Sequence, residues 1–219
     1  MRVRRGALED NLAMTQAAAL AELLRPAIGD ERVLAAIAAT PREVFVPESE
    51  RHRAYENIAL PIACGQTISQ PLVVARMLEL LELSPEDRVL DVGTGSGYHA
   101  ALISQLAAEV WTIERHEALS AAARRTVREL GMRNVNFVVG DGWLGLAEEA
   151  PFDAINVAAA TGESLPAVLE QQLAVRGRLV APVGAAHQHL IHTRRTRDGY
   201  QREQLEAVRF VPLVHGEDG

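Results

Sequence analysis

The chain has 219 residues, of which 48% are hydrophobic and 23% are charged, and its formal net charge at pH 7 is −7. The length and composition fit a single globular domain, and the acidic balance argues against a nucleic-acid partner. The one cysteine, Cys64, excludes an internal disulfide framework, and the absence of a long apolar run argues against a membrane partner. We therefore expect a monomer in a reducing, cytoplasmic setting without a targeting segment.

The first 83 residues predict a helical cap that leads into a loop. Residues 8–24 and 30–40 have the apolar spacing of helices, and Asp30 is placed to cap the second. TPREVFVPES (40–49) carries two prolines and predicts a turn region. GQTISQP (65–71) then interrupts apolar sequence, and its proline is placed to start a third helix.

From residue 88 onward the pattern changes to short apolar strands that alternate with helices. The predicted strands are RVLDVG (88–93), EVWTIE (109–114), NVNFVVG (134–140), FDAINVAAA (152–160) and GRLVAPVG (177–184). The predicted helices between them span 98–107, 117–131, where Gly131 is the stop signal, and 165–174. This alternation predicts βαβ units and a parallel sheet that is covered on both faces.

The tail has a different pattern. HQHLIHTRRT (187–196) and QLEAVRFVPL (204–213) flank the turn signal RDGY and predict a terminal antiparallel hairpin. The predicted fold class is therefore α/β, with a doubly wound, mostly parallel, Rossmann-like sheet. We expect one domain over 1–219, in which 1–83 form the helical cap and active-site loop, and 84–219 form the nucleotide-binding core and the hairpin.

VLDVGTGSGYHA (89–100) places Gly93, Gly95 and Gly97 between a strand and a helix. Glycines let the backbone turn sharply and approach a ligand closely, although a tight turn without a ligand is the alternative. Glu114 ends the next strand about 20 residues further on, where an acid can hydrogen-bond both hydroxyls of a ribose. The pattern thus favours a nucleotide site.

Two further acids indicate which nucleotide is bound. Asp91 precedes the G-x-G-x-G turn, where it would disfavour phosphate and favour the cationic amino-acid portion of a ligand. Asp141, in the GDGW stretch after the third strand, is placed to meet an adenine amino group, or alternatively to cap a helix. Together with Glu114, these strand ends indicate a site for S-adenosylmethionine, with S-adenosylhomocysteine as its product.

Seven stretches together resemble the protein-L-isoaspartate O-methyltransferase family, and they occur in the order found there. They are ALPIACGQTISQP, VLDVGTGSGYHAA, IERHEAL, NVNFVVGDGW, APFDAINVAAA, GRLVAPVG and VRFVPL. The resemblance covers about residues 30–215, and GQTISQP and VRFVPL are its most specific parts. It implies a methyltransferase domain and methyl transfer to the α-carboxylate of isoaspartyl residues in damaged proteins and peptides. The resulting ester would cyclise to a succinimide and begin repair.

The resemblance also implies which residues form the site. In that family the T-I-S segment closes over the methyl donor, and its serine contacts the acceptor carboxylate, which assigns Ser69 as the catalytic residue here. From the residues alone, a cap of the following helix is the alternative role for Ser69. The implied donor-binding residues are Gln66, Thr67, Ile68, Ser69, Gly93, Thr94, Gly95, Ser96, Gly97, Glu114, Arg115, Asp141 and Gly142.

Some positions depart from the family's pattern near the two predicted sites. Ala63 stands where the family usually has glycine, Cys64 replaces a commonly polar residue, and Ala158 replaces a threonine. The 161–165 loop is about one residue longer than usual. These changes leave open a carboxyl methyltransferase of the same fold with another peptide or small-molecule acceptor. A binding protein without turnover is the third class.

The remaining candidates have simpler structural interpretations. Cys64 is expected to be a buried structural cysteine. His99, in the first turn of a helix, is expected to line the cap. His187, His189 and His192 lack a companion acid or cysteine, so we expect a solvated edge strand there and no metal.

Overall fold

The computed structural model describes residues 3–216, and its strands within this range form a seven-stranded sheet and a small two-stranded sheet. The strand order in the large sheet is β5-β4-β3-β6-β7-β8-β9. Its strands are β3 (Arg88–Val92), β4 (Glu109–Glu114), β5 (Val135–Val139), β6 (Phe152–Val157), β7 (Leu173–Val183), β8 (Gln188–Arg195) and β9 (Tyr200–Val208). Neighbours from β5 to β7 are parallel, whereas β7, β8 and β9 pair antiparallel. The predicted fold class is thus confirmed.

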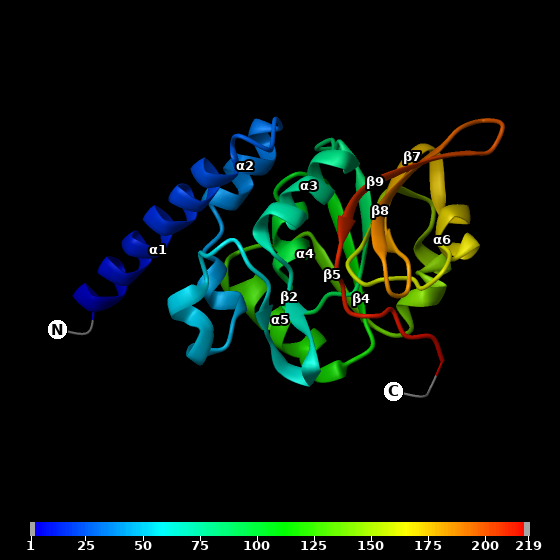
Figure 1. The fold of residues 1–219 in the computed structure, drawn as a ribbon. Helices are drawn as coiled ribbons and strands as arrows, with labels where there is room; N and C mark the ends of the chain where they lie inside the picture. The colour runs from blue at the N-terminus through cyan, green and yellow to red at the C-terminus, as the bar shows by residue number, and fades with distance from the viewer. Residues whose placement is uncertain (1–2, 217–219) are drawn as a thin grey trace.

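Helices cover both faces of the large sheet. In Figure 1, α3, α4 and α5 lie on one side of the sheet, α6 lies on the other side, and α1 extends away from the core with α2 beside it. The bounds are α1 (Val3–Leu24), α2 (Glu31–Ala38), α3 (Pro71–Leu81), α4 (Tyr98–Ile103), α5 (Glu117–Glu129) and α6 (Ala167–Gln171). No helix in residues 3–216 is long and apolar enough to span a bilayer.

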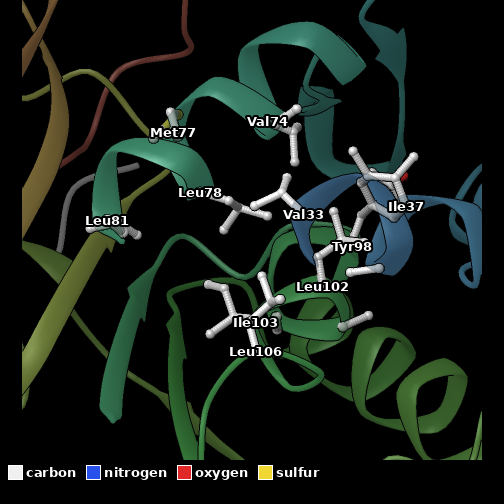
Figure 2. Packing of buried hydrophobic residues seen from close by; sticks show 14 of the residues in the cluster. Val33, Ile37, Val74, Met77, Leu78, Leu81, Tyr98, Leu102, Ile103 and Leu106 are labelled. Carbon is white, nitrogen blue, oxygen red and sulfur yellow. The ribbon is translucent and has the colours of Figure 1, made fainter. Parts of the chain in front are cut away.

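The hydrophobic core consists of one cluster on each face of the sheet. Successive strand residues alternate between them, so that Val89 belongs to the cluster under α2, α3 and α4, and Leu90 belongs to the cluster under α6. Figure 2 shows side chains from α2 and α3, including Val33 and Leu78, converging on Tyr98 and Leu102 of α4. This packing holds the N-terminal helices against the start of the helix that follows the glycine turn.

The local signals at three helix ends are confirmed. The side chain of Asp30 accepts a hydrogen bond from the amide of Arg32 at 2.9 Å and caps α2. Pro71 is the first residue of α3, and Gly131 follows α5 with a φ of 82°. Short-range chemistry therefore defined these boundaries correctly.

The strand predicted over 152–160 ends at Val157, and the strand predicted over 177–184 is part of the longer β7. Two predicted helices are markedly shorter in the structure. The helix expected over 98–107 ends at Ile103, and the chain continues in i→i+3 turns to Leu106. The helix expected over 165–174 is only α6, because Leu173 already pairs with Phe152 as the first residue of β7. Backbone pairing with the sheet thus replaces helical hydrogen bonds at that point.

The expectations for the tail and the histidines need correction as well. The second hairpin strand begins at Tyr200 and ends at Val208, so residues 209–213 lie beyond it. The first hairpin strand, β8, is internal, because β9 covers its outer side. His192 is consequently buried, and the prediction of a solvated edge strand was wrong there.

Candidate functional site

A cavity of about 320 Å³ opens at the carboxyl ends of β3, β4 and β6. The strand order reverses between β3 and β6, because the chain forms β3, β4 and β5 in one direction and then returns to place β6 on the other side of β3. Open α/β sheets bind ligands at such a point. The volume lies near the lower end of the ~300–1,000 Å³ usual for small-molecule sites. Its walls come from the loop around Ser69, the glycine turn, the end of β4 and the tail at residues 211–214.

The glycine turn forms the floor of this cavity. The amides of Gly93 and Thr94 both donate to the carbonyl oxygen of Ile113, at 2.9 and 3.3 Å, which fixes the turn against β4. Gly97 has a φ of 89°, and a Cβ there would lie 2.9 Å from the Cβ of Ala123 on α5. Gly97 is therefore required for close packing of the turn against α5, whereas Gly93 and Gly95 line the cavity.

A buried polar cluster supports the turn from below. Asp91 accepts hydrogen bonds from Asn156 Nδ2 at 2.8 Å and Thr112 Oγ1 at 2.9 Å, and the hydroxyls of Thr94 and Thr112 lie 2.7 Å apart. Burial raises the pKa of the Asp91 carboxyl to about 6, although these hydrogen bonds oppose the shift. The Asp91 side chain is 0% exposed. Its carboxyl therefore holds the turn and does not line the cavity, and its predicted preference for the cationic portion of a ligand stays a prediction.

Glu114 ends β4 at the edge of the cavity. Its Oε2 accepts from the amide of Gly95 at 2.9 Å, and its Oε1 accepts from the amide of His116 at 3.0 Å. Two backbone donors therefore orient a carboxylate that is only 7% exposed. Such a fixed acceptor suits a pair of ribose hydroxyls, and that role for Glu114 stays a prediction.

The loop that carries Ser69 forms the opposite wall. It folds as a two-stranded antiparallel sheet of β1 (Leu60–Pro61) and β2 (Thr67–Ile68), in which the amide of Ile62 donates to the carbonyl of Gln66 at 2.9 Å. The N-cap of α3 is Gln70, and Asn57 Oδ1 accepts from the amide of Leu72 at 2.9 Å. Ser69 is therefore not the cap of that helix, and the capping interpretation is wrong.

A buried arginine that the sequence did not single out holds this loop. Arg42, in the 3₁₀ helix η1 (Arg42–Phe45), donates through Nη2 to the carbonyl oxygens of Ile58 at 3.2 Å and Ser69 at 3.0 Å. Its Nη1 donates to the carbonyl of Ala54, and its guanidinium lies 5.7 Å from the ring centroid of Tyr98. Burial lowers the pKa of Arg42 to about 10, so the side chain remains a cation at neutral pH.

Asp141 lies beside the cavity and not in its lining, as far as the described residues show. Its carboxylate accepts from the amides of Trp143 at 2.9 Å and Gly216 at 3.0 Å, and it lies 2.7 Å from His215 Nδ1. Burial would raise the pKa of Asp141, but these hydrogen bonds lower it. Asp141 thus caps the 3₁₀ helix at Gly142–Leu144 and holds the tail, while its predicted contact with adenine stays a prediction.

His99 lines the cavity from the first turn of α4, where the sequence predicted that it would line the cap. The side chain is 6% exposed, and its Nε2 is buried without a hydrogen-bond partner among the described residues. Burial lowers the pKa of the imidazole to about 4, which leaves the ring neutral at physiological pH. The ring therefore borders the cavity, while its Nε2 is shielded from the surface in this arrangement.

Most of the predicted site residues come together around the cavity. Those in its lining are Gln66, Thr67, Ile68, Ser69, Gly93, Thr94, Gly95, Ser96, Glu114, Arg115 and Gly142. Residues that sequence reasoning missed include Val74, Tyr98, Ile113, Ala159 and the tail 211–214. The tail reaches the site because the amides of Ala160 and Leu213 exchange hydrogen bonds with the opposite backbone, and local sequence contains no signal for this pairing.

Cys64 also lines the cavity, contrary to its predicted burial as a structural cysteine. The residue is exposed and has a φ of 57°, a left-handed conformation that is unusual for a side chain other than glycine. The neighbouring Gly65 has a φ of 66°. Both residues form the sharp bend that joins β1 to β2, which explains why Cys64 points out of the core.

A second hollow of about 760 Å³ adjoins the first, and the Ser69 loop separates them. Thr67, Ser69, Ala158 and Val211 line both spaces. The second hollow is otherwise bounded by α3 and by residues 207–210 at the end of β9. Ser69 thus borders both hollows.

The sequence of the chain matches one protein family over nearly its whole length. The profile of "Protein-L-isoaspartate(D-aspartate) O-methyltransferase (PCMT)" matches residues 15–218. The chain is 55% identical over 195 residues to the protein-L-isoaspartate O-methyltransferase of Roseiflexus castenholzii, covering 89% of each chain. It is 51% identical over 207 residues to the protein of that name from Shewanella baltica, covering 94% of this chain and 98% of the relative.

Solved structures give the same result. A protein-L-isoaspartate O-methyltransferase superimposes with a TM-score of 0.81 at 28% identity, covering 90% of this chain and 65% of that one. A Plasmodium falciparum protein of the same description, in complex with S-adenosyl-L-homocysteine, superimposes with a TM-score of 0.79 at 26% identity. That match covers 90% of this chain and 98% of the other.

Proposed function

This chain belongs to the protein-L-isoaspartate(D-aspartate) O-methyltransferase family, and from that premise we propose how its residues methylate the α-carboxylate of L-isoaspartyl residues. The activity is that of an S-adenosylmethionine-dependent protein-L-isoaspartate O-methyltransferase, which acts on damaged proteins and peptides. The product ester cyclises to a succinimide without the enzyme, and hydrolysis returns some normal aspartate. The observation that carries the residue assignment is the position of Ser69 in the walls of two adjoining hollows.

The first cavity fits the methyl donor. The glycine turn has no side chains at Gly93 and Gly95, so the backbone is open to close approach by a ligand. Glu114 presents a carboxylate that two backbone amides orient at the edge of the cavity. When bound, S-adenosylmethionine supplies an electrophilic methyl group on a positively charged sulfur.

The second hollow supplies the acceptor side. A carboxylate with a reference pKa of about 3.9 is already ionised at neutral pH, so the reaction needs no general base. Ser69 orients that carboxylate by donating its hydroxyl hydrogen, and Arg42 fixes the loop that carries it. The contribution of the protein is therefore alignment of the reacting atoms, which can supply a large part of a rate enhancement.

The proposal also covers the setting of the protein. Residues 1–83 and 84–219 act as one domain, because α2 and α3 share a hydrophobic cluster with α4 and the sheet. The protein acts as a monomer, since residues of a single chain form both hollows. A cytoplasmic location suits a chain with one cysteine, because that compartment keeps thiols reduced.

A methyl-transfer assay with paired peptides tests this proposal. The purified protein is incubated with a radiolabelled methyl donor and with peptides that differ only in an isoaspartyl or aspartyl linkage. An isoaspartyl linkage moves one methylene into the backbone, so the wrong isomer places its carboxylate about 1 Å away, which can reduce the rate about 100-fold. We expect labelling of the isoaspartyl peptides and near-zero labelling of the aspartyl ones.

Two outcomes would contradict the proposal. Equal labelling of both isomers would indicate a carboxyl methyltransferase with another acceptor. Labelling of neither isomer, by a protein that binds S-adenosylhomocysteine in calorimetric titration, would indicate a binding protein without turnover. Light scattering on a sizing column checks the monomer.

A further inference from the structure

The hollow on the acceptor side continues along the end of the sheet. Residues 207–210 line both the 760 Å³ hollow beside Ser69 and another of about 850 Å³ beside the β7–β8 turn. The edge strand β9 ends at Val208, so this shared segment runs along the border of the sheet. We call the two connected hollows the acceptor groove.

One side chain gives the acceptor groove its charge. Among the described residues that line the groove, Arg209 is the only aspartate, glutamate, lysine or arginine. Arg209 is exposed, and the structure gives it no hydrogen bond or ion pair with any described residue. The nearby Glu206 is already paired with Arg76 at 3.0 Å. Arg209 is thus a free cation on an acidic protein.

We propose that Arg209 determines specificity for the sequence around the damaged residue, by favouring isoaspartyl segments that carry acidic side chains beside the isoaspartate. This inference rests on the proposed function, because it takes the groove beside Ser69 as the path of the peptide. The segments in which isoaspartate forms differ in sequence. The contacts that all of them can make are therefore those of the backbone and of the isoaspartyl carboxylate. The free guanidinium adds a charge-dependent preference to these contacts.

The expected size of the effect of Arg209 on peptide affinity follows from the exposure of its side chain. An exposed ion pair changes affinity by about 1.5- to 5-fold, and salt screens it over about 10 Å at 0.1 M ionic strength. Two acidic residues on the peptide should approach the upper end of this range. Without the guanidinium, the net charge of −7 would instead disfavour acidic peptides.

The experiment compares three isoaspartyl peptides that differ only at the two flanking positions, which carry glutamate, glutamine or lysine. Wild-type protein, Arg209→Gln and Arg209→Glu are assayed for kcat and KM at 25 and 250 mM salt. Arg128→Glu is the matched control, because it makes the same change in net charge at an exposed position on α5.

For the wild type we expect kcat/KM to be about 5-fold higher for the glutamate peptide than for the lysine peptide at low salt. Arg209→Gln should remove this ratio and Arg209→Glu should invert it, mainly through KM, whereas Arg128→Glu should keep the wild-type order. High salt should bring all the ratios toward one.

Three results would overturn the inference while leaving the proposed function intact. They are an unchanged ratio in Arg209→Glu, an equal change in Arg128→Glu, and a uniform loss on all three peptides. The last result would mean that Arg209 binds the isoaspartyl carboxylate itself. If wild-type protein methylates none of the peptides, the proposed function fails and the inference fails with it.

Discussion

The guanidinium of Arg42 donates a hydrogen bond to the carbonyl oxygen of Ser69 at 3.0 Å. The same buried side chain donates to the carbonyls of Ala54 and Ile58, so one residue joins η1 to three points of the following segment. The position of the Ser69 loop is therefore set by a residue that precedes it by 27 positions. This contact links the stability of the N-terminal cap to the geometry of the proposed active site.

Substitution of Arg42 should destabilise the protein. Arg42→Met leaves buried carbonyl oxygens without donors, and each costs about 1–3 kcal/mol, so the free energy of unfolding should fall by about 3 kcal/mol or more. Urea denaturation followed by circular dichroism measures this change. Arg42→Lys, which keeps the charge but fewer donors, should lose less, and the exposed Arg51→Met is the control. A loss below about 1 kcal/mol for Arg42→Met would contradict the assigned contacts.

Removal of the Ser69 hydroxyl should slow transfer without affecting the fold. Ser69→Ala loses one hydrogen bond to an anion, worth about 1.5–3 kcal/mol, which corresponds to about a 10- to 150-fold lower rate. Single-turnover transfer to an isoaspartyl peptide measures this rate. The affinity for S-adenosylhomocysteine should stay within about 2-fold of the wild-type value, because the turn and Glu114 are intact. The exposed Ser49→Ala serves as control. A mutant rate equal to that of the wild type would remove Ser69 from the reaction.

Two glycines with similar backbone angles should respond differently to alanine. Gly97 and Gly131 have φ values of 89° and 82°, but a Cβ at Gly97 meets Ala123 at 2.9 Å, while one at Gly131 meets nothing within 4 Å. Gly131→Ala should therefore lose only the ~1–2 kcal/mol of left-handed strain, and Gly97→Ala should lose about 1–3 kcal/mol more from overpacking. Thermal and urea unfolding compare the two. Equal losses would show that α5 moves aside at no cost.

Acid should destabilise the fold through His99. Because burial lowers the pKa of His99 to about 4, the unfolded chain takes up a proton near its ordinary value of 6.5 while the folded protein does not. The stability that the neutral ring contributes is complete above pH 6.5 and is lost as pH falls toward 4, at up to about 1.4 kcal/mol per pH unit. Asp91, whose pKa is raised to about 6, acts in the opposite direction: its contribution is complete below about pH 4 and is lost as pH rises to 6.

Urea denaturation between pH 4.5 and 7.5 separates these two groups. The difference in free energy of unfolding between wild type and His99→Leu should shrink as pH falls, because the variant lacks the group that acid protonates. The exposed His52→Leu should follow the wild-type profile. A constant difference between wild type and His99→Leu would mean that His99 has the same pKa in the folded and the unfolded protein, which would contradict the lowered pKa.

Much of the fold could be predicted because its signals are local. The alternation of apolar strands and helices from residue 88 onward predicted a parallel sheet with an antiparallel hairpin, which the strand order confirms. The cap at Asp30, the helix start at Pro71 and the stop at Gly131 depend on residues within one helical turn. The glycine turn and Glu114 came together because parallel strands end at the same edge of a sheet.

The sequence by itself therefore determined the fold class, the family and the segments that surround the cavity, since periodicity, caps and motifs are properties of neighbouring residues. Only the tertiary structure decided that Asp91 supports the turn from below, that Cys64 is exposed and that β8 is covered by β9. It also decided that Arg42 holds Ser69. These features depend on contacts between residues far apart in the chain, and burial, charge pairing and strand neighbours are fixed only when distant segments pack together.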